Sequence, residues 1–228
     1  MQNDINILGY SGSHLSLIIE TLSRLQFKGL VSIIMHDDVK YFDVPFQAAE
    51  IKLEVKKYYE LLERPETGFF FCSNKPSNKM FLYSFFHDKW KVTEDAFVSI
   101  IHPSSVIASS VKHGNGLYLE PLSVVSPYAE IGFGVSINRQ CSIGHHNVLN
   151  DYCSIYPGTH LTGDVEIGRG VTIGPGTTVF SGVKIGDNTV IGGGSVVTRN
   201  MPPNVLAFGN PCKPIEDLPP SKKQTSIT

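Results

Sequence analysis

The sequence predicts a mixed fold, in which a small Rossmann-like α/β domain precedes a parallel β-helix. In the second half of the chain, a branched aliphatic residue recurs every six positions from Ile101 to Val197. In the first third, strand-like and helix-like segments alternate, as they do in α/β domains. A chain of 228 residues has room for both units. We expect the α/β domain at residues 1–95, the β-helix at residues 98–215 and a flexible tail at residues 216–228.

The six-residue period runs through the β-helical segment without an insertion. Seventeen consecutive steps meet sixteen branched aliphatic residues and one histidine, His113. A helix would show apolar spacings of three and four, and a half-buried strand would alternate. A period of six is typical of a solenoid, in which each short strand forms one side of a repeating coil. We expect His113 to point inward in an imperfect first coil, and both His102 and His113 to be structural.

Two further positions of the repeat support this interpretation. Four residues after each aliphatic stands a mostly small or β-branched residue, such as Ser123, Cys141 or Thr159, which we expect to fit a tight inward corner. Glycine often follows the aliphatic directly, as at Gly144 and Gly192. We attribute these glycines to turns that need a positive φ.

The composition argues against several classes of function. Basic and acidic side chains are nearly balanced, 19 against 21, and no basic stripe indicates nucleic-acid binding. No apolar run approaches membrane-spanning length, and the N-terminus shows no signal peptide. The four cysteines, Cys72, Cys141, Cys153 and Cys212, form no C-x-x-C pair. We therefore expect a reduced, cytoplasmic protein that does not insert into membranes.

The N-terminal third divides into short elements. We expect strands at Ile5–Leu8, Leu30–Met35 and Phe69–Cys72, an amphipathic helix at Leu15–Leu25, and a second helix from about Ala48 to Leu62. Ligands of a Rossmann-like unit gather at the carboxyl ends of its strands. The turn that begins at Gly9 and the pair Asp37–Asp38 follow the first two strands, so both are candidate binding segments. By themselves, Gly9-x-x-Gly12 is equally typical of a tight strand-to-helix turn, and the two acids of a solvated loop.

The repeat resembles that of the hexapeptide-repeat acyltransferases, whose domain is a left-handed parallel β-helix with three sides per coil. The left hand comes from this resemblance alone, because the general rule for crossovers favours a right-handed connection. Three sides of six residues imply that residues eighteen apart stack on neighbouring coils. With an α/β domain in front, the chain resembles the bacterial nucleotide-sugar acetyltransferases. These include the bacillosamine-pathway and perosamine N-acetyltransferases and the sialic acid O-acetyltransferases.

In that family the N-terminal domain holds the sugar nucleotide, with a G-x-[SG]-G-H turn near the phosphates and acids after the second strand near the base or ribose. Ser13 stands where the family usually has histidine, and His14 comes one residue later. The resemblance assigns sugar-nucleotide binding to the turn and to the two acids: Gly9, Ser11, Gly12, Ser13, Asp37 and Asp38.

The resemblance places the chemistry near His145. The family has a histidine two residues after a repeat aliphatic, and His145 matches it after Ile143. Acyl transfer to an amine or an alcohol needs a base, and histidine suits this role near neutral pH. Gly163, eighteen residues on, matches the family glycine whose backbone N–H faces the thioester carbonyl as an oxyanion donor. Asn138 matches a family asparagine near the sugar.

The chain departs from the family beside this histidine. The family usually has an acid directly after it and a second histidine nine residues later, where this chain has His146 and Ser154. By the stacking of residues eighteen apart, we expect Asp164 to lie next to His146, which would allow a relay between them. His146 is the alternative catalytic base.

The end of the repeat resembles the family segment that lies beside the coenzyme A tail. The resemblance implies acetyl-CoA as cosubstrate and no metal, with the coenzyme along Gly163, Ser181, Gly193, Pro211 and Lys213. A solvated lysine is an equal alternative for Lys213. The family forms its cleft between adjacent β-helices around a threefold axis, which implies a homotrimer.

We expect N-acetyl transfer from acetyl-CoA to a nucleotide-linked amino sugar, a 4-amino-4,6-dideoxyhexose, in bacterial surface glycan biosynthesis. Acetylation of a sugar hydroxyl is the alternative, because a base serves both acceptors. A zinc enzyme like the hexapeptide-repeat carbonic anhydrases would need a pair of histidines five apart, and none of the eight histidines has that spacing. A non-catalytic solenoid such as an ice-binding surface would show Thr-x-Thr ladders, which the sequence lacks.

Overall fold

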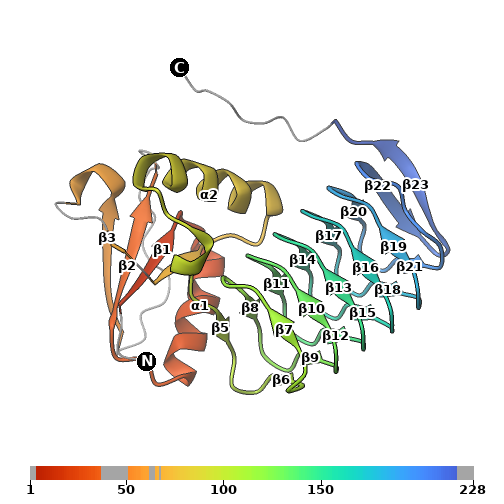
Figure 1. Ribbon diagram of the computed structural model, residues 1–228, viewed down its shortest axis with the longest axis horizontal. Coiled ribbons are helices and arrows are strands. Elements are labelled where there is room, and N and C mark those ends of the chain that lie inside the picture. Colours follow the sequence, from red (N-terminus) through yellow and green to blue (C-terminus); the bar gives the residue numbers. More distant parts are fainter. Residues whose placement is uncertain (1–3, 37–50, 62–64, 67, 220–228) are drawn as a thin grey trace.

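An α/β domain lies at one end of a long, regular coil (Figure 1). The structure, a computed structural model, describes residues 4–36, 51–61, 65, 66 and 68–219. Among these residues, the sheet of the α/β domain has four parallel strands in the order β3-β2-β1-β4. The strands are β1 (Ile5–Leu8), β2 (Leu30–Met35), β3 (Lys52–Lys57) and β4 (Phe69–Phe71). The helices are α1 (Gly12–Arg24), α2 (Pro76–Trp90) and the short 3-10 helices η1 (Tyr58–Glu60) and η2 (Glu94–Ala96).

The two long helices pack on opposite faces of this sheet. Ile7 of β1 belongs to a buried cluster with Leu15 of α1, whereas the next residue, Leu8, packs in a cluster with Leu82 of α2. This alternation follows from the period of two in a strand. The expected strand–helix–strand unit is therefore present, and its two faces are both covered, as in a Rossmann-like domain.

The prediction of a helix from about Ala48 to Leu62 is wrong for the residues of this segment that the structure describes. Lys52–Lys57 is the strand β3, which pairs in parallel with β2 from Leu30 to Met35. Leu53 and Val55 pack against the α1 side, while Glu54 between them accepts a hydrogen bond from Ser32 of β2. Charged residues are depleted in strands, but pairing with a neighbouring strand overrides a local propensity. Residues 48–50 and 62 lie outside the described residues.

The coil is built from two-residue strands with a corner after each. In chain order they are β5 (Ile100–Ile101), β6 (Val106–Ile107), β7 (Lys112–His113), β8 (Tyr118–Leu119), β9 (Val124–Val125), β10 (Glu130–Ile131), β11 (Ser136–Ile137), β12 (Ser142–Ile143), β13 (Val148–Leu149), β14 (Ser154–Ile155), β15 (His160–Leu161), β16 (Glu166–Ile167), β17 (Thr172–Ile173), β18 (Thr178–Val179), β19 (Lys184–Ile185), β20 (Val190–Ile191) and β21 (Val196–Val197). An antiparallel pair, β22 (Val205–Gly209) and β23 (Cys212–Asp217), closes the end.

These strands form three parallel faces within the described stretch from residue 68 to residue 219. The β12 face contains β6, β9, β12, β15, β18 and β21; the β13 face contains β7, β10, β13, β16 and β19; the β14 face contains the remaining coil strands with β22 and β23. Ser142 pairs with His160 and Ile143 with Leu161, so each coil takes eighteen residues, as predicted. We name the corner between the β12 and β13 faces the His145 corner, and the corner between the β14 and β12 faces the Asn138 corner.

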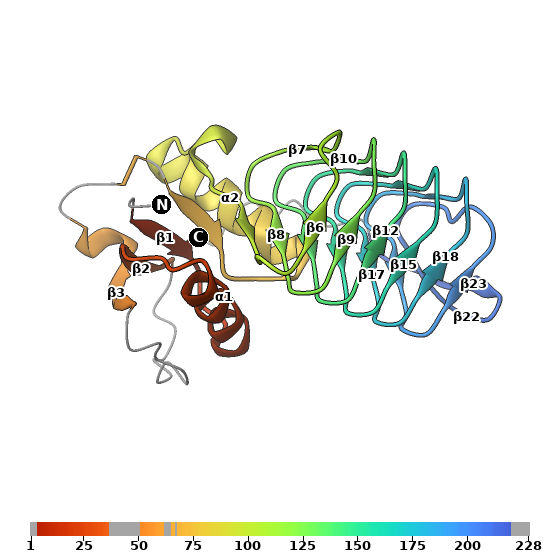
Figure 2. The same ribbon diagram turned by 90° about the horizontal axis from the view of Figure 1, so that it is seen from below.

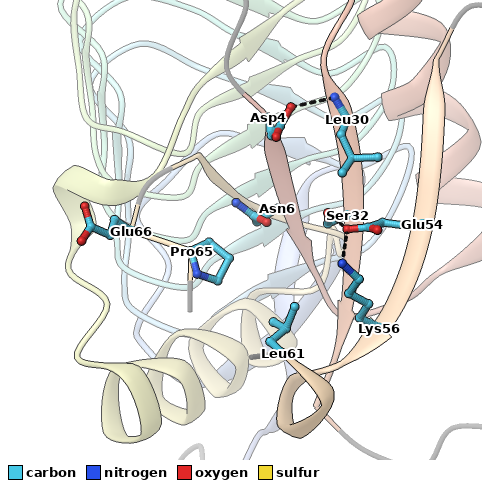
Figure 3. Close-up of a pocket in the computed structure, with 9 residues that line it drawn as sticks. All are labelled: Asp4, Asn6, Leu30, Ser32, Glu54, Lys56, Leu61, Pro65 and Glu66. Carbon is cyan, nitrogen blue, oxygen red and sulfur yellow. Dashed lines mark hydrogen bonds and ion pairs between the residues drawn. The ribbon is translucent and has the colours of Figure 1, made fainter. Parts of the chain in front are cut away.

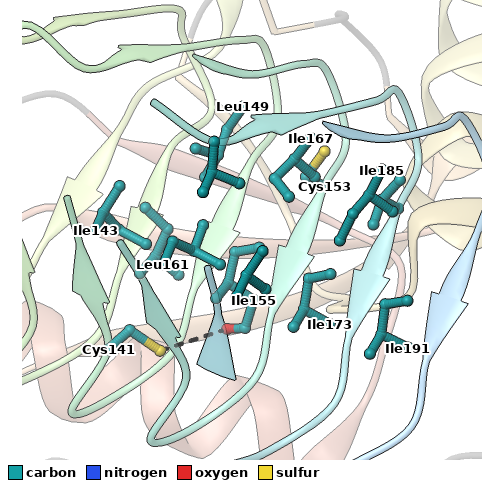
Figure 4. Packing of buried hydrophobic residues seen from close by; sticks show 14 of the residues in the cluster. Cys141, Ile143, Leu149, Cys153, Ile155, Leu161, Ile167, Ile173, Ile185 and Ile191 are labelled. Carbon is teal, nitrogen blue, oxygen red and sulfur yellow. Dashed lines mark hydrogen bonds between the residues drawn. The ribbon is translucent and has the colours of Figure 1, made fainter. Parts of the chain in front are cut away.

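The repeat aliphatics fill the axis of the coil (Figure 4). From Leu119 to Val197 every one of them is buried, in a single cluster that also takes in the inward cysteines Cys141 and Cys153. His113 differs from the expectation, because its side chain is exposed and its Nδ1 lies 2.9 Å from the Gly114 carbonyl oxygen. The reason is that β7 is the outermost strand of its face, so no coil covers that side of it.

The glycines after the aliphatics are explained by packing rather than by φ. Positive φ falls two residues later in the repeat, for example at His146, Gly158 and Asp164. A methyl group on Gly144 would instead collide with the backbone of Leu161 and Thr162 on the next coil. Glycine is needed there because neighbouring coils approach closely, so our expectation of a positive φ at these glycines was wrong.

Helix α2 joins the α/β domain to the coil (Figure 2). Its Lys79 is fully buried and donates to Gly134 O over 2.7 Å, Cys153 O over 3.2 Å and the hydroxyls of Ser136 and Ser154 over 3.1 and 3.2 Å. Ser154, the position of the family's second histidine, thus serves the junction between the two units.

The C-terminal end of the described chain extends further in regular structure than we expected. Strand β23 runs to Asp217, so Glu216 and Asp217 of the predicted tail pair with β22. Residues 220–228 of that tail lie outside the described residues. In the part of the chain that the structure describes, neither helix has the length and apolar character needed to cross a membrane.

Candidate active site

His145 and His146 stand where the chain turns from β12 to β13. His146 has the left-handed conformation, with φ 55°. Its N–H donates to Pro127 O over 3.2 Å, and the Asp164 N–H donates to His145 O over 3.0 Å. The corner is therefore bonded to the coil before it and to the coil after it, which fixes the backbone from which both imidazoles project.

Gly163 lies against the ring of His145, as the eighteen-residue stacking predicts. A methyl group on Gly163 would lie 2.6 Å from His145 Nε2 and closer still to Cε1. Among the described residues, the Gly163 N–H donates to no acceptor. On the third corner of the coil, the equivalent N–H of Arg169 donates to the Asp187 carboxylate over 2.8 Å. Gly163 thus leaves both room for the imidazole and an unused backbone donor beside it.

The other nitrogen of His145 faces two polar groups. His145 Nδ1 lies 3.0 Å from His146 Nδ1 and 3.9 Å from Asp164 Oδ2. A carboxylate near Nδ1 favours the tautomer that carries its proton there, donating toward His146 Nδ1. In that tautomer Nε2, on the Gly163 side, has a free lone pair and can act as a base.

His146 is held in place by an aromatic neighbour. Its ring stacks on Tyr128, with centroids 5.0 Å apart and planes inclined by 26°. The side chains of His145 and Asp164 are 58% and 63% exposed, so their attraction is weakened by solvent and orients the ring more than it stabilises the fold.

Ser181 continues the column of Gly163 on the next coil. Its side chain is exposed, and its hydroxyl donates to Thr162 Oγ1 over 3.2 Å. The structure therefore brings four predicted residues together along the His145 corner: His145, His146, Gly163 and Ser181.

Asn138 lies on a different corner. It is buried, and its Oδ1 has no hydrogen-bond partner among the described residues. Glu120, one coil earlier, is also buried; its Oε2 accepts from Arg139 N over 3.2 Å and from Arg139 Nη1 over 3.1 Å, while its Oε1 is unpaired in the described chain. Burial raises the pKa of Glu120. Our sequence analysis missed Glu120, although an acid at a repeat position where glycine is common was a usable signal.

The remaining predicted coenzyme residues lie toward the Asn138 corner at the C-terminal end. A methyl group on Gly193 would lie 3.0 Å from Pro175 O, so this corner is closely packed. Gly209 N donates to Ser195 Oγ over 3.2 Å, which ties the β22–β23 turn, with Pro211 beside it, to the same corner. Lys213 is exposed on β23. Within one chain the whole β12 face separates these residues from His145.

The predicted turn in the α/β domain follows β1. Gly9 has φ 81°, and its N–H donates to Ile34 O over 2.9 Å. Ser11 precedes the helix α1 with an extended backbone, and its side chain makes no capping hydrogen bond. Gly12 and Ser13 are the first two residues of α1, whose N-terminal N–H groups suit an anion. Asp37 and Asp38 lie outside the described residues.

His14 does not replace the family's histidine at the surface of this turn. Its ring is buried edge-on against Tyr118, with centroids 5.3 Å apart, and burial lowers the pKa of His14 to about 4. The neutral ring therefore belongs to the contact between α1 and the coil.

A polar hollow of about 320 Å³ lies on the α/β sheet beside the amino ends of β1 and β2 (Figure 3). Glu54 accepts from Ser32 Oγ over 2.6 Å and pairs with Lys56 Nζ over 2.7 Å, and these bonds lower the pKa of Glu54. The charged side chains of Glu54 and Lys56 in this hollow are thus paired with each other. The hollow is also remote from the carboxyl ends of the strands, so we do not assign the substrate to it.

The chain is similar to known transferases of the hexapeptide-repeat type. Residues 148–181 match the family model described as bacterial transferase hexapeptide (six repeats). A histidine-to-alanine variant of GDP-perosamine N-acetyltransferase from Caulobacter crescentus, solved with CoA and GDP-perosamine, is 26% identical, with 95% of this chain and 99% of that chain covered and a TM-score of 0.80. The predicted resemblance is confirmed.

Two more distant structures share the whole fold. The acetyltransferase domain of PglB from Neisseria gonorrhoeae FA1090, in complex with acetyl coenzyme A, is 20% identical, covers 94% of this chain and 100% of its own, and has a TM-score of 0.78. WeeI from Acinetobacter baumannii AYE is 22% identical, covers 93% and 100%, and has a TM-score of 0.72. The predicted fold, an α/β domain followed by a left-handed parallel β-helix of hexapeptide repeats, is confirmed.

Proposed function

We propose that this chain is an acetyl-CoA-dependent N-acetyltransferase that acts on a nucleotide-linked amino sugar in bacterial glycan biosynthesis. The observation that carries the proposal is the arrangement at the His145 corner, where an imidazole with a polar partner on Nδ1 lies against a glycine whose N–H has no acceptor among the described residues. The likeness to a transferase solved with CoA and GDP-perosamine supports the substrate class.

In the proposed reaction, His145 Nε2 is the general base. The sugar amine attacks the thioester carbon and must lose a proton as the tetrahedral centre forms or collapses. Nε2 takes that proton, and the resulting imidazolium is stabilised by His146 Nδ1 at 3.0 Å and the Asp164 carboxylate at 3.9 Å. The thiolate of CoA then leaves, and a positioned base of this kind contributes roughly 10²–10⁴ in rate.

The Gly163 N–H is the proposed oxyanion donor. It has no other acceptor in the described residues and lies next to the base, so a thioester carbonyl bound there would receive a hydrogen bond as its charge develops. Loss of one such donor typically costs about 3–4 kcal/mol of transition-state stabilisation.

We propose a homotrimer whose active site is shared between two chains. The site residues of one chain lie on two corners that its own β12 face keeps apart, so a second copy must bring its Asn138 corner to the His145 corner of the first. Exposed apolar side chains mark this face and both corners: Val106 and Val124 on the face, Leu122 and Tyr128 on the corners. Three prisms that turn this face toward a common axis bury these residues and complete three sites.

The sugar nucleotide and the coenzyme take different ends of this cleft in the proposal. The nucleotide binds at the carboxyl edge of the α/β sheet, along the turn from Gly9 to Ser13 and the pair Asp37–Asp38. The coenzyme runs along the coil toward the C-terminal end, past the residues Gly163, Ser181, Gly193, Pro211 and Lys213. The compartment we propose is the cytoplasm, because all four cysteines are unpaired.

A thiol-release assay with acetyl-CoA tests the proposal. The acceptors are UDP-, dTDP- and GDP-linked 4-amino sugars, each beside its 4-hydroxyl analogue. Release that depends on an amino sugar supports N-acetylation, and release with the hydroxyl analogue alone identifies an O-acetyltransferase. No acceptor-dependent release with any member of the panel contradicts the proposed substrate class.

A further inference from the structure

Three metal-binding side chains converge on the Nδ1 side of the proposed base. One donor atom from each of His145, His146 and Asp164 can be chosen so that all lie within 4.8 Å of one another. The two imidazole Nδ1 atoms are 3.0 Å apart, and Asp164 Oδ2 is 3.9 Å from His145 Nδ1. In the part of the chain that the structure describes, no other group of three such residues converges in this way.

We propose that these residues bind a zinc ion, and that the bound zinc inhibits the enzyme and is not a cofactor of the reaction. Zinc prefers tetrahedral sites with nitrogen and oxygen ligands at about 2.0–2.1 Å, which places ligand atoms about 3.3 Å apart. The two separations that involve His145 Nδ1, 3.0 Å to His146 Nδ1 and 3.9 Å to Asp164 Oδ2, lie on either side of this value. All three side chains are exposed on the single chain, so rotation about their side-chain bonds can bring the donor atoms to this separation, and water in the cleft can supply the fourth ligand.

Inhibition follows from the tautomer that zinc requires. Zinc takes the lone pair of His145 Nδ1, so the single proton of the neutral ring must sit on Nε2. The nitrogen on the Gly163 side then has no lone pair and cannot accept a proton from the substrate amine. The metal binds at Nδ1 and acts through the tautomer, whereas the substrate amine is deprotonated at Nε2, so we expect acetyl-CoA and the sugar nucleotide still to bind. This part of the inference rests on the proposed function, whereas the binding of zinc does not.

The cysteines do not compete for the metal. Zinc binds thiolates, and burial raises the pKa of Cys72 and Cys153 to about 12 and that of Cys141 to about 11. Burial also raises the pKa of Cys212, and all four cysteines are buried.

Calorimetric titration of the full-length, metal-free protein with zinc chloride tests the site directly. We expect one zinc per chain at micromolar concentration. His146→Gln and Asp164→Asn should each weaken binding by at least roughly 10-fold, the loss typical even of a residue that only supports a metal ligand. His113→Gln, at an exposed histidine on the first coil, should leave binding unchanged. Absent binding, or binding that survives both site substitutions, overturns the proposed site.

Kinetics in the presence of zinc test the inhibition. Zinc should lower kcat of the wild-type enzyme while KM for acetyl-CoA stays constant, and a chelator should restore kcat. Zinc that binds but leaves kcat unchanged, or that raises only KM, overturns the tautomer argument. A protein that binds zinc at these residues but shows no acetyl transfer with any sugar retains the metal site and refutes the proposed function instead.

Discussion

Gly163→Ala should inactivate the protein without unfolding it. The added methyl group would lie 2.6 Å from His145 Nε2, well inside van der Waals contact, so the imidazole must swing away. The φ of Gly163 does not lie in the left-handed region, so alanine is acceptable to the backbone. The conflict is with the far end of an exposed side chain, which moves at little cost to stability.

The expected loss can be worked from the role of the displaced group. A positioned base contributes roughly 10²–10⁴ in rate, so kcat should fall by this factor, about 3–5 kcal/mol in activation free energy. Stopped assays of thiol release give kcat, and binding of acetyl-CoA by calorimetry should change little. Gly116→Ala is a suitable control, because it imposes a left-handed alanine on the third corner, at a cost of about 1–2 kcal/mol in stability, without touching the site.

The double variant separates this mechanism from a general distortion. If alanine at position 163 acts by moving His145, then adding Gly163→Ala to His145→Ala should change kcat little further. Additive losses would mean that the added methyl group also obstructs the bound thioester, because alanine keeps the backbone N–H. A Gly163→Ala protein with wild-type kcat would refute the reasoning, since His145 could not then be working from the position that the structure gives it.

Three further predictions follow from the site, the α/β domain and the junction. His145→Ala should keep both substrates bound but lower kcat by roughly 10²–10⁴, and His146→Ala should cost less; steady-state kinetics with the reverse order would exchange their roles. Asp37→Ala should weaken sugar-nucleotide binding in calorimetry and leave acetyl-CoA affinity unchanged; equal loss of both would contradict the assignment. Burial lowers the pKa of Lys79 to about 7, below the ordinary 10.5. Between these two pH values the unfolded chain therefore binds one proton more than the folded chain. The free energy of unfolding should rise with pH across this range, by at most about 1.4 kcal/mol per pH unit. The free energy of unfolding, measured by urea denaturation, should depend less on pH in this range for Lys79→Met. If it does not change with pH in the wild-type protein either, the hydrogen-bond acceptors of Lys79 keep its amine charged.

The coil could be predicted from sequence because its geometry repeats. A period of six fixes which residues face the axis, and a coil of eighteen residues then fixes which residues stack. For this reason Gly163 and Asp164 could be placed beside His145 and His146 before the structure was known. The N-terminal segments do not repeat, so β3 was taken for a helix on its charged composition, and pairing with β2 decided its structure instead.

Contacts between the two units could not be predicted. Helix α2 shows no amphipathic pattern, because one side packs on the sheet through Leu82 and Phe86 while another inserts Lys79 into the coil. The burial of Glu120 Oε1, which has no hydrogen-bond partner among the described residues, also depends on which side of its corner is covered. Such features arise where two surfaces meet, and a single periodicity carries no information about the partner surface.

The replacement of an adjacent acid by His146 explains both the proposed catalysis and the proposed sensitivity to zinc. His146 and Asp164 occupy equivalent left-handed positions on successive coils, so a carboxylate from the next coil reaches the same side of His145 that an adjacent acid would serve. The base thus keeps an orienting partner at 3.0 Å and a negative charge at 3.9 Å. An acid in place of His146 would orient the base through carboxylate oxygen alone and remove one of two imidazoles from the metal site. A carboxylate would still bind zinc, so the informative change is His146→Gln, whose amide oxygen can accept from His145 Nδ1 but is a poor zinc ligand. His146→Gln should retain part of the acetyl transfer and lose inhibition by zinc, and retained inhibition in an active His146→Gln protein would show that the metal does not act through this pair.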